Sequence, residues 1–193
     1  MKQVLQGLIF VTLLLPTMKS FGQTSSIEKQ AQKIISQLKG NGEYPVDAMD
    51  TLIDLNGDGF KDLLIEYYGA AGTGLKNRIT VYLYDEAKKK LKSCETLNDL
   101  ANPTFYFKNK IVVGYYIANG GGSATKLKWH GLRLDTLEHI EVDVSNKGDQ
   151  TIFSLTAYNF VSKKKTTKIV DAMELPKEYK YFHYQPIIKR RGQ

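Results

Sequence analysis

The residues whose types and spacing are best suited to chemistry lie between positions 54 and 62, in the segment DLNGDGFKD. Side chains that carry oxygen stand at positions 1, 3, 5 and 9 of this segment, and a backbone carbonyl is available at position 7. These oxygens can converge on one point when the chain curls, and the glycine at position 6 permits the sharp bend. Oxygen ligands suit Ca²⁺ better than Zn²⁺, which prefers nitrogen and sulfur. The spacing therefore predicts a calcium site formed by Asp54, Asn56, Asp58, the Phe60 carbonyl and Asp62.

The residues around this segment indicate strands rather than helices. A helix-loop-helix calcium site needs a glutamate at position 12, where this chain has Ile65, and Asp62 is followed by the strand-like run LLIEYY. We therefore expect a loop between two strands, with residues 51–54 entering and residues 63–67 leaving. The alternative is a tight hairpin turn at Asn-Gly or Asp-Gly. That turn would explain the glycines but would leave three neighbouring aspartates, which repel one another, with only Lys61 nearby. The expected role of the ion is structural.

One helix is expected ahead of the loop. Apolar residues recur at spacings of three and four from Ile27 to Leu38, which places them on one face of a helix. Ser25 and Glu28 fit a capping box, and Gly40 fits a helix terminator. The pattern predicts a helix over residues 26–39.

The rest of the chain has the pattern of short strands. Segments rich in β-branched and aromatic residues are separated by short polar turns, which is typical of an antiparallel meander. The expected strands cover residues 79–84, 111–117, 124–129, 137–144, 151–158 and 168–170. The predicted fold class is therefore mainly β, an antiparallel meander that is propeller-like or a sandwich, with one N-terminal α-helix. The spacing of the strands also leaves a barrel open.

The first 22 residues have the layout of a secretory signal peptide. They carry an early lysine, an apolar run from Leu8 to Leu15 and small residues near Gly22. Because a helix needs about 20 apolar residues to cross a bilayer, this run is too short for an anchor. We expect cleavage after Gly22, no transmembrane anchor after cleavage, and an exported protein that is periplasmic or secreted. Residues 23–193 would form a single calcium-binding β domain.

Composition limits the partners of such a protein. The formal net charge of +7 is mild, and in an exported chain it does not predict a nucleic-acid partner. The single cysteine, Cys94, cannot form an intramolecular disulfide. Glycine-rich stretches are expected to be loops that are available for binding another macromolecule. The candidate partner-binding residues in these stretches are Gly72, Thr73, Gly121, Gly122 and Ser123.

Two resemblances follow from these residues. DLNGDGFKDLLIEYY resembles the calcium loop of VCBS/FG-GAP-type repeats, the blade motif of integrin-like β-propellers, in a single copy. Residues 54–142 also resemble a bacterial exported family related to a calcium-binding periplasmic lysozyme inhibitor with a propeller-like β fold. This second likeness rests on the order of the loop, GAAGTG, ITVYLYD, NPTFYF, NGGGSATK and KLKWHGLRL. It implies a non-enzymatic protein with the five residues named above around calcium and a loop that blocks a muramidase active site.

The leading functional prediction is an exported, non-enzymatic calcium-binding β protein that binds a protein or glycan of the cell envelope through its glycine-rich loops. A narrower alternative is a periplasmic lysozyme inhibitor, whose partner would be a lysozyme. An alternative from another class is a hydrolase of cell-envelope glycans, which needs two carboxylates on opposite sides of a groove. Its candidate acids are Glu66, Asp135, Glu138, Glu141 and Asp143.

Overall fold

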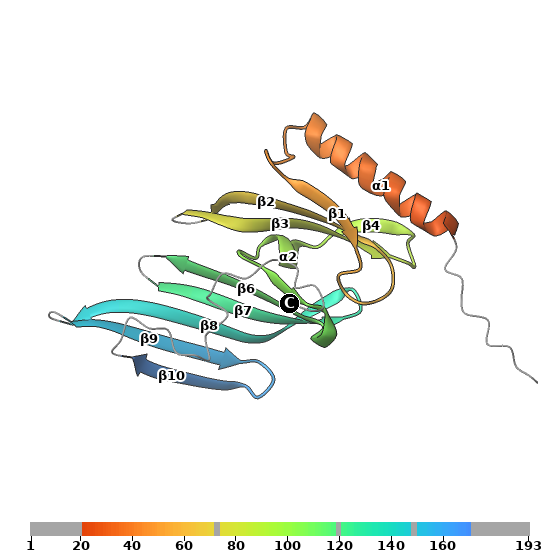
Figure 1. Ribbon diagram of the computed structural model, residues 1–193. Coiled ribbons are helices and arrows are strands. Elements are labelled where there is room, and N and C mark those ends of the chain that lie inside the picture. Colours follow the sequence, from red (N-terminus) through yellow and green to blue (C-terminus); the bar gives the residue numbers. More distant parts are fainter. Residues whose placement is uncertain (1–20, 72–73, 119–120, 148–149, 171–193) are drawn as a thin grey trace, which may run out of the picture.

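The computed structural model describes residues 21–71, 74–118, 121–147 and 150–170. One long helix is followed by ten strands and two short helical segments (Figure 1). In chain order the elements are α1 (Phe21–Gly40), β1 (Met49–Ile53), β2 (Asp62–Ala71), β3 (Gly74–Asp85), β4 (Lys90–Ser93), α2 (Glu95–Asn98), β5 (Thr104–Tyr106), the 3₁₀ turn η1 (Phe107–Asn109), β6 (Ile111–Ala118), β7 (Gly121–His130), β8 (Arg133–Lys147), β9 (Gln150–Asn159) and β10 (Lys164–Val170). The predicted signal peptide lies almost wholly outside the described residues.

The strands form two antiparallel sheets. The first sheet has the order β1-β2-β3-β4, and the second has the order β10-β9-β8-β7-β6-β5. Within each sheet every strand pairs with its neighbour in sequence, so both sheets are meanders, and the described strands do not close into a barrel. The prediction of a mainly β fold with an antiparallel meander and one N-terminal helix is confirmed.

The two sheets pack against each other through one apolar core. Alternation along β2 directs Leu64 toward the second sheet, while its neighbours Leu63 and Ile65 face the other way. The core between the sheets contains Leu55, Leu64, Ile79, Val81 and Leu83 with Leu97 of α2, and Phe105, Val112, Leu127 and Trp129 of the second sheet. The arrangement is that of a sandwich.

Helix α1 covers the outer face of the first sheet (Figure 1). Its buried residues Ile27 and Ala31 pack with Leu63 and Ile65 of β2. The helix ends at Gly40, close to the predicted end, but begins at Phe21 rather than at residue 26. Ser25 therefore lies inside the helix and does not cap it. The chain before Ser25 is itself helical, so the first turn is formed by residues that the prediction assigned to the leader and its flank.

Several residues of the glycine-rich stretches at 69–74 and 120–123 lie in strands rather than in the predicted loops, whereas Gly57 and Gly59 do lie in a loop. Gly69 lies in β2, and Gly121, Gly122 and Ser123 lie in β7, paired with both β6 and β8. Gly121 has a φ of 134°, and a Cβ at this position would lie 1.9 Å from the carbonyl oxygen of Val142. Glycine is needed here because the two strands approach each other closely. In the sequence alone, glycines of this kind cannot be told apart from the glycines of a loop.

Candidate metal centre

The acidic segment forms the loop between β1 and β2, as predicted. It begins directly after Ile53, the last residue of β1, and returns at Asp62, the first residue of β2. Position 12 of the segment, Ile65, is fully buried within β2, which agrees with the expected strand in place of an exiting helix. The loop lies at the end of the sandwich where the turn between β7 and β8 is found (Figure 1).

Asp54 organises the first half of the loop. Its Oδ1 accepts hydrogen bonds from the backbone N–H groups of Gly57 at 2.7 Å and Asp58 at 3.2 Å, and its Oδ2 accepts one from Gly59 at 2.8 Å. Gly57 and Gly59 have φ values of 75° and 89°, which favour glycine. The chain is thereby curled around the Asp54 carboxylate, as the calcium-loop prediction expects.

Asn56 and Asp58 lie next to each other inside this curl. The Asn56 Oδ1 accepts a hydrogen bond from the Asp58 backbone N–H at 3.0 Å, and its Nδ2 donates to Asp58 Oδ2 at 2.9 Å. Asp58 Oδ1 accepts a further hydrogen bond from the Phe60 N–H at 2.8 Å. Asn56 is buried, with 3% of its surface exposed, whereas Asp58 is exposed. Three of the predicted ligands therefore meet in one turn of the chain.

Asp62 is placed differently from the other carboxylates. It is completely buried, and its two oxygens accept hydrogen bonds from the backbone N–H groups of Leu55 and Tyr84, each at 2.9 Å. Burial raises the pKa of Asp62 to about 7, and the nearby Asp58 and Asp54 carboxylates add to this rise, while the two N–H donors oppose it. Asp62 thus joins the end of the loop to β3, and its pKa depends on the charges of Asp54 and Asp58.

One lysine from the second half of the chain lies over the loop. A Cβ on Gly57 would lie 3.3 Å from Cε and 3.5 Å from Nζ of Lys110, so the Lys110 side chain passes directly above this residue. Lys110 follows η1 and has a φ of 55°. Positive charge so close to the aspartates reduces their mutual repulsion. No local pattern predicts this contact, because 53 positions separate the two residues.

The donor set fits a hard cation in part. A carboxylate oxygen has two acceptor sites, so Asp54 Oδ2, which accepts one hydrogen bond from the Gly59 N–H, retains capacity for an ion. The described residues contain no group of three or more His, Cys, Asp or Glu side chains arranged to hold a metal. Calcium and its full ligand set therefore stay a prediction.

The predicted partner-binding residues are only partly described. Gly72 and Thr73 lie outside the described residues. Ser123 pairs with Tyr116 of β6 and Glu141 of β8, and Glu141 pairs with Thr156 of β9. Residues that pair across strands share a face, so these four form one polar row across the second sheet. The structure therefore replaces the predicted loop at Ser123 with part of a sheet surface.

Comparisons with known proteins give little. No protein family matches the chain, and no curated protein matches it. One solved structure is similar, described as the structure of a Xanthomonas type IV secretion system related protein. It is 18% identical, with a TM-score of 0.44, over 61% of this chain, and the match spans 57% of that chain. Among the helices of the described residues, none has the length and apolar character needed to cross a membrane.

Proposed function

We propose that the protein is an exported, non-enzymatic β protein that binds one calcium ion in residues 54–62 and uses the stabilised fold to bind a macromolecule of the cell envelope. The observation that carries the calcium proposal is the curl around Asp54, whose carboxylate accepts three backbone N–H groups of the same loop. This curl holds Asn56 and Asp58 beside each other, so the polypeptide needs little further ordering to surround an ion.

The ion would be held by side-chain oxygens of Asp54, Asn56 and Asp58 and by the Phe60 carbonyl, with Asp62 completing the set. Binding would exchange the hydrogen bond between Asn56 Nδ2 and Asp58 Oδ2 for two contacts to the cation, with the Asn56 amide presenting its oxygen. The chemistry that calcium supplies here is neutralisation of neighbouring carboxylates. Its role is structural, since Asn56 and Asp62 tie the loop to both sheets.

Export is proposed from the predicted signal peptide, and macromolecule binding from the polar row that contains Ser123. The row carries the hydroxyls of Ser123 and Thr156 and the exposed Glu141 carboxylate on neighbouring strands, which suits a glycan or a polar protein surface, while Lys76 of β3 lies over the Tyr116 ring. The lysozyme-inhibitor alternative is the narrower form of this proposal. The hydrolase alternative remains a separate outcome of the test.

The test uses the protein that begins at Gln23, together with the variant Asp58→Ala. Thermal unfolding is measured with about 2 mM calcium and with excess chelator, because extracellular calcium modules bind with up to about millimolar affinity. Calcium should raise the Tm of the parent protein but not that of the variant. Binding is then tested by sedimentation with purified peptidoglycan and by lytic assays with lysozymes. Calcium-dependent sedimentation or loss of lysis supports the proposal. An unchanged Tm, or release of reducing sugars from the glycan, contradicts it.

A further inference from the structure

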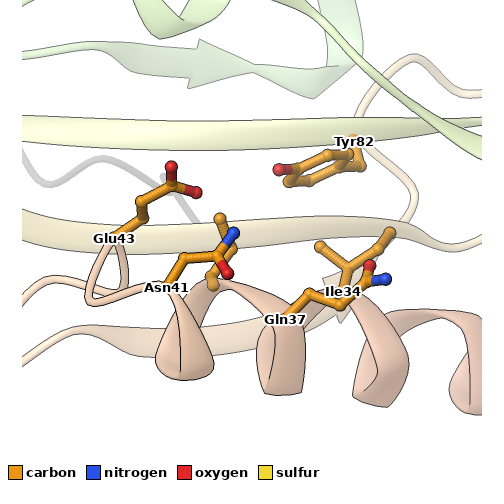
Figure 2. A pocket seen from close by; sticks show the side chains of 6 residues that line it. Ile34, Gln37, Asn41, Glu43 and Tyr82 are labelled. Carbon is orange, nitrogen blue, oxygen red and sulfur yellow. The ribbon is translucent and has the colours of Figure 1, made fainter.

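A pocket of about 400 Å³ lies on the outer side of the first sheet, away from the acidic loop. It is bounded by the second half of α1, by the segment that follows this helix and by β3, and it is lined by Ile34, Gln37, Leu38, Asn41, Glu43 and Tyr82. Figure 2 shows the Tyr82 ring on one side, Asn41 and Glu43 on the other, and Gln37 and Ile34 along the helix. Its volume is within the range of small-ligand sites.

The end of α1 fixes the polar side of this pocket. The backbone N–H of Asn41 donates to the Gln37 carbonyl at 3.0 Å, and the N–H of Glu43 donates to the Leu38 carbonyl at 2.8 Å. Gly42, between them, has a φ of 72°, which allows this tight ending of the helix. Asn41 and Glu43 are therefore presented by a hydrogen-bonded turn rather than by a long loop, and their side chains are held near the pocket.

The apolar floor comes from the same helix. Ile34 and Leu38 are partly buried and pack against the cluster that joins α1 to the first sheet. Tyr82 is also partly buried and packs against this cluster. A ligand that enters the pocket would thus meet aliphatic side chains and an aromatic ring below, and polar groups at the rim.

The polar lining can act entirely through oxygen acceptors. The Glu43 carboxylate, the Tyr82 hydroxyl and the amide oxygens of Gln37 and Asn41 can all accept hydrogen bonds. Burial, followed by the charges of Glu95 and Glu43, raises the pKa of Tyr82. Lys39, on the same helix, does not line the pocket: its Nζ lies over the Tyr44 ring, 4.7 Å from the ring centre. Glu43 is the one charged residue among the described residues that line the pocket, so the lining carries a negative charge in a chain whose net charge is positive.

We propose that this pocket binds a primary alkylammonium group, in the form of a lysine side chain presented by a partner protein. An ammonium group has three N–H donors and no acceptor, so it matches the Glu43 carboxylate, the Tyr82 hydroxyl and one amide oxygen. The methylene stem of lysine packs on Ile34 and Leu38, as such stems do on apolar surfaces. The proposal rests on the proposed function as a binding protein and names the chemistry of one contact.

The test is a titration followed by backbone amide NMR, with Nα-acetyl-lysine methylamide as the probe. Nα-acetyl-norleucine methylamide is the matched control, because it keeps the apolar stem and lacks the ammonium group. We expect the lysine probe to bind at about millimolar affinity, the value typical of a ligand this small, with shifts at residues 37–43 and 82. The norleucine control should bind at least about tenfold more weakly, the factor that corresponds to losing one charge-assisted contact.

Variants locate the contact. Glu43→Gln should weaken binding of the lysine probe about tenfold and Tyr82→Phe about threefold, in line with the loss of a charged and a neutral hydrogen bond. Glu28→Gln, at an exposed position on α1 outside the pocket, should leave it unchanged. Equal binding of the two probes, or an unchanged affinity in Glu43→Gln, overturns the proposal. Because the probe is a small molecule, the titration in Asp58→Ala separates the pocket from the calcium site: binding there supports the pocket even where calcium binding fails.

Discussion

Asn56 donates a hydrogen bond from Nδ2 to the carbonyl oxygen of Gly131 at 3.3 Å, and this contact joins the acidic loop of the first sheet to the β7–β8 turn of the second. Asn56 is 3% exposed, so water cannot readily replace it. The loop is therefore a junction between the two sheets as well as a candidate cation site. We therefore expect the conformation of the loop to affect the stability of the contact between the two sheets at this end of the sandwich.

Asn56→Ala should lower the free energy of unfolding by about 1–3 kcal/mol in the presence of chelator, because it leaves the Gly131 carbonyl and the Asp58 N–H without this partner. Urea unfolding followed by the fluorescence of Trp129 measures this change. Asn41→Ala, at an exposed position, is the control and should change stability by less than about 0.5 kcal/mol. Equal stability of the two variants would show that the junction contributes nothing.

Lys110→Gln should strengthen calcium binding. The Lys110 ammonium lies beside Gly57, in the loop that carries the predicted ligands, and its positive charge would repel a cation bound there. Since pairs of exposed charges contribute at most about 1 kcal/mol, the expected gain is about two- to fivefold in Kd, and it should shrink as salt is added. Lys108→Gln, exposed in η1, is the matched control. A weaker calcium affinity in Lys110→Gln would contradict this reading of the contact.

Gly121→Ala should destabilise the protein by about 2–4 kcal/mol, since the new Cβ would overlap the Val142 carbonyl and the backbone would be strained at a φ of 134°. Thermal unfolding measures the loss. Gly131→Ala is the comparison: it also has a positive φ, 62°, but a Cβ there meets nothing within 4 Å, so it should cost only about 1 kcal/mol. If both variants lost the same stability, residues 121–123 would not be packed within the sheet.

Glu66→Gln should raise the Tm at pH 7 by a few degrees. Glu66 is partly buried on β2, and burial raises the pKa of its carboxyl. Because the pKa of Glu66 is higher in the folded state than in the unfolded state, protonation of Glu66 favours folding. The stability that protonated Glu66 contributes is therefore present at low pH and is lost as pH rises through the folded-state pKa. The variant mimics the protonated acid, and its advantage should disappear below about pH 4, where the carboxyl is protonated in both states.

Differential scanning calorimetry between about pH 3 and pH 8, a range that extends below ordinary carboxyl pKa values, follows the difference in Tm. Glu86→Gln is the control, because Glu86 is exposed in the turn between β3 and β4. A Tm difference for Glu66→Gln that is constant with pH would exclude ionisation of Glu66 as its cause.

The sequence predicts the features that depend on local patterns. The apolar spacing from Ile27 to Leu38 identifies the long helix, and the strand-like run LLIEYY after Asp62 identifies an exiting strand in place of a second helix. The meander follows from strands joined by short polar turns, which favour pairing between neighbours. These features need no knowledge of distant contacts.

Most features that the sequence does not predict depend on contacts between residues far apart in the chain. Gly121 and Gly122 have the composition of a loop, and only the closeness of Val142 explains why glycines stand in a strand. The contact of Lys110 with Gly57, and the burial of Asp62 against the Tyr84 amide, require the two sheets and β3 to be in place. The helix start also differs, since residues 21–24 extend α1 beyond Ser25.

Isothermal titration of calcium into the chelator-treated protein that begins at Gln23 tests the central claim most directly. The account predicts saturable binding of about one ion per chain, in the range known for single calcium loops, and no saturable heat in Asp58→Ala. Lys61→Ala, which alters an exposed residue of the same loop that supplies none of the predicted ligands, should bind calcium as the parent does. Absence of saturable heat in the parent protein, or the same binding in Asp58→Ala, would contradict a calcium centre at residues 54–62.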